Sequence, residues 1–165
     1  IVIPKERSCM HIDTLFTQIS KDEFVIYEQT LKSNLIKVTQ FNDDGSKVEF
    51  STLQEFFLSV NPSMKFILCG NAEYPFDERE QWTDGCNLVA VRDGVAIAYD
   101  RNTKTAEALY EIGYEIVSGR DIAKEWNYGN FNPEKYEKTI ITLPSTELSR
   151  ARGGPHCMTF PVLRG

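Results

Sequence analysis

A chain of 165 residues has the length of about one domain and can bury a hydrophobic core without disulfides or metal ions. Its composition, with 41% hydrophobic and 25% charged residues, excludes disordered and fibrous proteins. The net charge of −6 argues against a nucleic-acid or anionic-membrane partner, since such partners need a basic face. No stretch approaches the roughly 18 apolar residues of a membrane span.

The start of the sequence is the next clue to its class. The chain begins at Ile1 with neither Met nor a charged and then apolar leader, which predicts that it carries no secretory signal. We therefore expect a cytoplasmic protein that has been trimmed or is a piece of a longer chain.

Alternating apolar residues and turn signals predict strands along the whole chain. The first two strands are expected to form a hairpin, and the pair around 42–45 is expected to fold back across that turn. A three-residue turn at 92–94 predicts a third hairpin. The predicted strands cover 9–19, 24–27, 35–41, 48–50, 65–69, 88–91, 95–99, 114–117 and 158–162.

Two segments have the apolar spacing of helices. The first covers 53–60, with Ser51 or Thr52 as N-cap, and the second covers 103–112, with Gly113 as C-cap. The polar segment 120–139 is predicted to be an insertion or a mobile loop.

The order strand, strand, helix, strand occurs about twice, over 35–69 and over 88–117. This order predicts the α/β class with short local sheets instead of one doubly wound sheet.

The four cysteines are typical of neither a metal site nor a disulfide framework. They lie 60, 17 and 71 residues apart, at Cys9, Cys69, Cys86 and Cys157. We expect reduced thiols, no metal ligands and at least one cysteine of interest for its reactivity.

The two histidines and Cys157 are the candidates for chemistry. His156 directly precedes Cys157, whereas His11 lies two residues before Asp13 on a predicted strand, where both share a face. A Cys and a His far apart in sequence can form a nucleophile and a proton-transfer pair once the chain folds. The alternative is that the cysteine is an inert core thiol and each histidine a hydrogen-bonded structural residue.

The segment before Cys157 favours the catalytic alternative. Gly153 and Gly154 allow close backbone approach, and Pro155 fixes the chain just before the thiol. Arg150 and Arg152 could hold a carboxylate or depress the thiol pKa, although a solvated basic stretch would look the same.

Four segments, in order along most of the chain, resemble motifs of the arginine deiminases. The first, Met10 to Thr17, resembles the family's Met-His-x-Asp-Thr-x-Phe segment, and the last, with Arg152-Gly153-Gly154-Pro155-His156-Cys157-Met158, resembles its nucleophile segment. The four segments are Met10 to Thr17, Gly70-Asn71 with Glu78 to Gly85, Tyr99 to Thr103, and Glu147 to Thr159.

The resemblance implies a fold and a reaction. Arginine deiminases hydrolyse L-arginine to L-citrulline and ammonia without a metal or organic cofactor. Their fold is a pseudo-fivefold α/β propeller of ββαβ modules, the pentein fold, and residues 1–165 resemble its C-terminal part. We therefore expect a partial pentein propeller of about two to three modules.

The resemblance also implies roles for individual residues. Cys157 is the nucleophile that attacks the guanidinium carbon, His11 is the general acid and base, and Asp13 is a carboxylate that grips the guanidinium. Weaker matches imply substrate-binding roles for three further residues. Arg152 would lie near the substrate carboxylate, Asn71 in a loop that approaches the site, and His156 beside the thiol.

The rest of the family's substrate-binding groups have no counterpart here. A second guanidinium-binding Asp, a Glu beside the nucleophile and arginines for the substrate carboxylate come from the family's N-terminal part. We therefore expect that this chain needs that part as its partner and is inactive, or nearly so, alone. Homo-oligomers are also expected if open propeller edges expose apolar surface.

Three other functions remain open on the sequence. The chain could belong to another guanidine-modifying enzyme, such as an agmatine deiminase or an amidinotransferase. It could instead be a non-catalytic module that binds arginine or a partner. A cysteine protease also uses Cys and His, but its motifs are not seen here.

Overall fold

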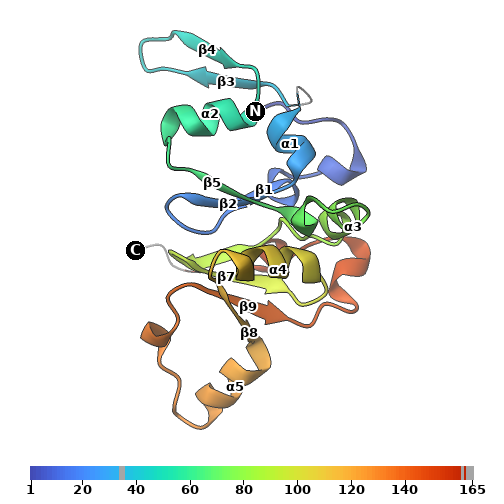
Figure 1. The fold of residues 1–165 in the computed structure, drawn as a ribbon, viewed down its shortest axis with the longest axis vertical. Coiled ribbons are helices and arrows are strands. Elements are labelled where there is room, and N and C mark those ends of the chain that lie inside the picture. Colours follow the sequence, from blue (N-terminus) through green and yellow to red (C-terminus); the bar gives the residue numbers. More distant parts are fainter. Residues whose placement is uncertain (34–35, 161, 163–165) are drawn as a thin grey trace.

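The computed structural model describes residues 1–33, 36–160 and 162, and Figure 1 shows their arrangement. The strands of these ranges form three sheets, ordered β1–β2–β5, β3–β4 and β6–β7–β9–β8. The small β3–β4 hairpin lies at one end of the molecule and α5 at the other. The described helices include none that is long and apolar enough to cross a membrane.

The first sheet joins a hairpin to a strand that follows a helix. β1 runs antiparallel to β2, and β5 lies parallel to β2 on its other side. Between β2 and β5 the chain makes α1, the β3–β4 hairpin and α2. The bounds are β1 Phe16–Gln18, β2 Glu23–Ile26, α1 Glu28–Lys32, β3 Val38–Phe41, β4 Lys47–Phe50, α2 Leu53–Val60 and β5 Lys65–Leu68.

The second sheet repeats this plan with one more strand. β6 and β7 form an antiparallel hairpin, and β9 lies parallel to both β7 and β8, between them. The 3-10 turn η3 and α3 connect the two sheets. The bounds are η3 Cys69–Ala72, α3 Phe76–Trp82, β6 Val89–Arg92, β7 Val95–Tyr99, α4 Thr103–Glu111, β8 Glu115–Ser118, α5 Gly119–Asn127 and β9 Thr139–Leu143.

One hydrophobic core joins the two larger sheets. Val25 and Ile67 of the first sheet belong to the same buried cluster as Ala96 and Ile140 of the second. Because successive strand residues point to opposite faces, Phe24 on β2 enters a second cluster, beneath α2. β2 is therefore buried on both faces, which explains its unbroken apolar run.

Both helices predicted from apolar spacing are confirmed. Thr52 is the N-cap of α2, and its hydroxyl accepts a hydrogen bond from the backbone N–H of Glu55. Gly113 follows α4 with a φ of +94°, a conformation that favours glycine after a helix. The predicted hairpins around 42–45 and 92–94 are also confirmed.

The strand predicted over 9–19 is wrong for most of its length. The chain forms the 3-10 turns η1, Arg7–Cys9, and η2, Ile12–Thr14, before β1 begins. The hydroxyl of Thr14 donates to the carbonyl of His11 at 2.6 Å, and such local side-chain bonds compete with strand pairing. His11 and Asp13 therefore do not share the face of a strand.

The predicted order of strand, strand, helix and strand occurs over 35–69, as β3, β4, α2 and β5, and over 88–117. The strands of the first copy do not form one sheet, because β5 pairs with β2, whereas β3 and β4 pair with each other. By strand pairing, β1, β2 and β5 correspond to β6, β7 and β9, since each set is an antiparallel hairpin with a parallel strand beside its second strand. Pairing between distant strands depends on packing and not on local pattern.

Two other predicted segments need correction. The segment 120–139 is not loop throughout, because α5 covers most of its first half and the 3-10 turn η4, Pro133–Lys135, lies in the second. The alternative that the segment is an insertion stays a prediction. β9 follows directly and was not predicted. The strand predicted over 158–162 is wrong for 158–160, since Met158 ends the 3-10 turn η6, His156–Met158, and residue 161 lies outside the described ranges.

Glu23 is a buried carboxylate that connects the two larger sheets. It accepts a hydrogen bond from the hydroxyl of Tyr114 at 2.6 Å, and Nζ of Lys138 lies 3.3 Å from its other oxygen. Burial by itself would raise the pKa of Glu23, but the hydrogen bonds from Tyr114 and Lys138 bring it below its usual value. The folded state therefore favours the ionised carboxylate.

This lowered pKa sets how stability depends on pH. Ionised Glu23 stabilises the fold above its unfolded pKa, and that contribution disappears as pH falls through the lower folded pKa. We expect the free energy of unfolding to fall less steeply on acidification in Glu23→Gln than in the parent chain. Urea denaturation between about pH 3 and about pH 7 measures this, with the exposed Glu134→Gln as control. Parallel pH profiles for Glu23→Gln and the parent would contradict it.

Candidate active site

The turn after α3 carries the polar side chains that organise the site. α3 ends where Asp84 adopts a φ of +65°, a left-handed conformation that stops the helix. The backbone N–H of Gly85 then bonds to the carbonyl of Glu80 at 2.7 Å, and that of Asn87 to the carbonyl of Asp84 at 3.0 Å. This compact turn directs Asp84 and Asn87 toward the segment that contains Cys157.

Cys157 lies on η6 and is held by Asn87. Nδ2 of Asn87 donates to Sγ of Cys157 at 3.4 Å, and Oδ1 of the same side chain accepts from the backbone N–H of His156 at 3.0 Å. Cys157 is exposed, whereas Cys69 and Cys86 are buried and Cys9 is half-buried. The prediction of free thiols is confirmed, since all four cysteines are free.

Asp13 lies beside the thiol with one oxygen unused. Sγ of Cys157 donates to Oδ2 of Asp13 at 3.8 Å, which joins residues 144 positions apart. Oδ1 of Asp13 is buried and has no hydrogen-bond partner among the described residues. A buried carboxylate oxygen without a donor is costly, so this oxygen is suited to receive an N–H donor from a bound cation.

The charges around Cys157 oppose its ionisation in the free site. Burial raises the pKa of the thiol, and the negative charge of Asp13 raises it further. The backbone of Gly154 and the amide of Asn87 lower it, but the raising effects prevail. The thiol is therefore protonated at neutral pH until a positive charge approaches.

Asp84 holds the turn at Gly153 and Gly154 through a backbone hydrogen bond. Its Oδ2 accepts from the backbone N–H of Gly153 at 3.0 Å, and the hydroxyl of Tyr99 donates to the carbonyl of Gly153 at 2.9 Å. Burial raises the pKa of Asp84, while Gly153 and the charge of Arg152 lower it. Both backbone groups of Gly153 are thus bonded, which holds the approach to Cys157 in one conformation.

Arg152 is placed near the site by contacts with backbone carbonyls. Its guanidinium donates to the carbonyls of Arg7 at 3.2 Å and Gln81 at 3.3 Å, and it lies 4.5 Å above the ring of Trp82. Its buried Nε has no partner among the described residues. The predicted contact of Arg152 with a substrate carboxylate stays a prediction.

The two histidines are both exposed at the surface. His11 is exposed and precedes η2, and its backbone carbonyl accepts from Thr14. His156 is exposed and lines a cavity of about 420 Å³ together with Asp13. The structure thus brings Cys157, Asp13 and His156 together and leaves the proton-transfer role of His11 as a prediction.

Asn71 is, like His11, a predicted site residue whose side chain makes no hydrogen bond to the others among the described residues. It is exposed on η3 with a φ of +55°. No hydrogen bond within the described part of the chain joins it to Asp13, Asn87 or Cys157. Its substrate-binding role stays a prediction.

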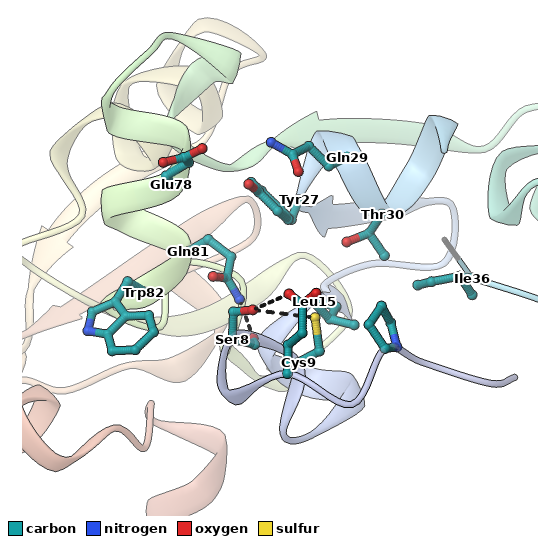
Figure 2. A pocket seen from close by; sticks show the side chains of 12 residues that line it. Ser8, Cys9, Leu15, Tyr27, Gln29, Thr30, Ile36, Glu78, Gln81 and Trp82 are labelled. Atoms are coloured by element: carbon teal, nitrogen blue, oxygen red, sulfur yellow. Dashed lines mark hydrogen bonds between the residues drawn. The ribbon is translucent and has the colours of Figure 1, made fainter. Parts of the chain in front are cut away.

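Gln81 links the segment of Asp13 to α3. Figure 2 shows its buried amide pointing toward Ser8 and Leu15 at the edge of a second cavity of about 300 Å³. Nε2 of Gln81 donates to the carbonyls of Ser8 at 2.7 Å and Thr14 at 3.1 Å. Because Thr14 directly follows Asp13, Gln81 anchors the backbone next to this carboxylate to α3.

The sequence predicted the site residues near the two ends of the chain but not those that connect them. Asp84 and Gln81 lie in the segment Glu78 to Gly85, which resembles a family motif but predicted no role for them, and Asn87 lies just beyond that segment. The signal available was the polar cluster after α3, which contains Asp84 and Asn87. No group of three or more His, Cys, Asp or Glu side chains within the described ranges is arranged to hold a metal ion.

Comparison with known proteins identifies a family to which this chain is similar. A family model described as arginine deiminase matches residues 1–164. Curated relatives named arginine deiminase occur in Mycoplasma capricolum subsp. capricolum, at 34% identity over 98% of this chain, and in Latilactobacillus sakei, at 32% over 99%. A third, in Listeria innocua serovar 6a, is 32% identical over 99%. The chain spans only 35% to 36% of the length of these relatives.

Proposed function

The chain belongs to the arginine deiminase family, and on that premise we propose that it supplies the nucleophile of an enzyme that hydrolyses L-arginine to L-citrulline and ammonia. The observation that carries the proposal is the pairing of Cys157 with Asp13, whose buried Oδ1 has no donor. A guanidinium offers N–H donors and a positive charge to that oxygen.

The first step is activation of the thiol by the substrate. A guanidinium is resonance-stabilised and a poor electrophile, so it needs a strong nucleophile and a group that localises its charge. Paired with Asp13, the cation offsets the negative charge that raises the pKa of Cys157. The thiol proton passes to His11, and the thiolate attacks the guanidinium carbon.

The remaining steps return every group to its starting state. Protonated His11 gives its proton to the departing nitrogen, so that ammonia leaves and an amidino-thioether remains on Cys157. Neutral His11 then takes a proton from water, which adds to the same carbon. Breaking the carbon–sulfur bond expels the sulfur, which takes back the proton from His11 and is again a thiol. The hydroxyl of the adduct gives its proton to the released ammonia and becomes the carbonyl of citrulline. One histidine thus serves as acid and then as base.

The site needs groups that this chain does not supply. Because the chain spans about a third of its relatives, we infer that their remaining part provides a second guanidinium-binding carboxylate and the ligands of the substrate carboxylate. The two larger sheets, β1–β2–β5 and β6–β7–β9–β8, would then belong to modules of a pentein propeller that the remaining part completes. Arg152, Asn71 and His156 are proposed to contribute to substrate binding.

Citrulline formation from L-arginine tests this function. We expect no measurable activity from this chain alone, activity when the polypeptide corresponding to the relatives' remaining part is added, and its loss in Cys157→Ala. Agmatine in place of arginine distinguishes an agmatine deiminase. Arginine binding without ammonia release in the complete assembly would overturn the catalytic proposal and favour a non-catalytic module. Activity from the chain alone would contradict the split site.

A further inference from the structure

Asn87 is the buried polar residue that touches the sulfur of Cys157 and has no role in the reaction described above. Its side chain is fully buried, with 0% of its surface exposed. It bridges two neighbouring residues of the nucleophile turn, the backbone N–H of His156 through Oδ1 and Sγ of Cys157 through Nδ2. A buried amide is expected to have such partners on both of its ends.

The direction of this amide follows from its partners. Oδ1 can accept from the N–H of His156, whereas Nδ2 placed there would set two donors against each other. The opposite end, which faces the sulfur, is therefore the N–H donor. A donor aimed at sulfur bonds more strongly to a thiolate than to a thiol, because the acceptor is then charged.

Gly154 shows that the turn is shaped around this amide. A Cβ atom on Gly154 would lie 2.6 Å from Cγ of Asn87, and closer still to its Oδ1. Gly154 has no positive φ, so its backbone conformation is open to any residue. The space that Asn87 occupies is thus what requires glycine at this position.

On the proposed function, we infer that Asn87 is a further catalytic residue, which stabilises the thiolate of Cys157 and fixes its sulfur beside Asp13. The negative charges of Asp13 and Asp84 raise the pKa of the Cys157 thiol, whereas the hydrogen bond from the Asn87 amide lowers it. If Asn87 only held the turn in place, it would act through its hydrogen bond to the backbone N–H of His156, and the ionisation of the thiol would not depend on it.

Thiol alkylation distinguishes these roles without any need for arginine. The rate at which iodoacetamide modifies Cys157 is followed against pH, with the Cys157 peptide quantified by mass spectrometry. Asn87→Ala removes the donor to the sulfur without adding a charge, whereas an Asp at this position would raise the thiol pKa by its own negative charge. We expect the apparent pKa of Cys157 to rise by at least about one unit, and the rate below that pKa to fall about tenfold. An unchanged pH profile in a folded Asn87→Ala chain would overturn the inference.

Two further variants provide a second test and a control. Gly154→Ala displaces the amide by a different route and should raise the same pKa, with no added effect in the double variant. Asn102→Ala is the matched control, because Asn102 is also buried but bonds to Thr83 and not to Cys157. It should leave the alkylation profile unchanged.

A measurement on the unsubstituted chain covers the case in which the variants fail to fold. The side-chain NH₂ signals of Asn87 in an NMR titration should move with the ionisation of Cys157, and the movement should vanish in Cys157→Ser. Asn87 NH₂ signals that do not change as Cys157 ionises would refute the contact. Alkylation and NMR results stand whether or not the assembled enzyme turns over arginine, so failure of the proposed function is seen separately.

Discussion

Replacing Asp13 with Asn should lower citrulline formation in the completed enzyme by about 10³-fold or more while making Cys157 more reactive toward alkylation. The two effects have opposite signs because Asp13 does two things. Its buried Oδ1 is the free acceptor for the guanidinium, and its charge raises the pKa of the neighbouring thiol. Asn removes the charge, so the thiolate forms more readily, but it binds the cation poorly.

The measurement pairs a citrulline assay with iodoacetamide alkylation near neutral pH. Asp121→Asn on the exposed surface of α5 is the matched control and should change neither result. Slower alkylation of Asp13→Asn would show that the charge of Asp13 does not hold the thiol protonated. Undiminished turnover would remove Asp13 from the guanidinium site.

Replacing Glu80 with Ala should lower the free energy of unfolding by about 3 kcal/mol. Glu80 is buried on α3 and accepts the backbone N–H groups of Lys104 and Thr105, each at 2.8 Å, and the Thr105 hydroxyl at 2.7 Å. Glu80 thus caps the N-terminus of α4 from a neighbouring helix. The side chain of the N-cap residue, Asn102, makes no such bond. The charge of Glu80 also suits the positive end of the helix.

Urea denaturation at neutral pH measures the loss. Glu107→Ala, an exposed carboxylate on α4 that pairs only with Lys104 among the described residues, is the control and should cost at most about 0.5 kcal/mol. Equal losses in the two variants would mean that Glu80 acts as a surface charge and does not cap the helix. Because Glu80 lies on the helix that leads to Asp84 and Asn87, the alkylation profile of Glu80→Ala would also report how far the site depends on α4.

The helices that the sequence predicted are those that short-range interactions determine. α2 has its apolar residues at helical spacing and Thr52 as its cap, all within about ten neighbouring residues. α3 was missed because its polar residues face the interior, where Glu80 and Gln81 bond to distant backbone groups. β9 was missed because its place between β7 and β8 depends on two partners elsewhere in the chain.

The sequence by itself determined the motifs that indicate the family and the candidate residues for the proposed chemistry. The segments around Asp13 and Cys157 hold distinctive residue types in a fixed local order, which needs no three-dimensional information. What only the tertiary structure decided is how those groups act together. Asp13 meets Cys157 across 144 positions, and Asn87 reaches the sulfur across 70. Such contacts form where the segment of Asp13 and the turn after α3 meet the segment of Cys157. The local sequence pattern does not predict them, because hydrogen bonds between distant segments form only once the chain has folded.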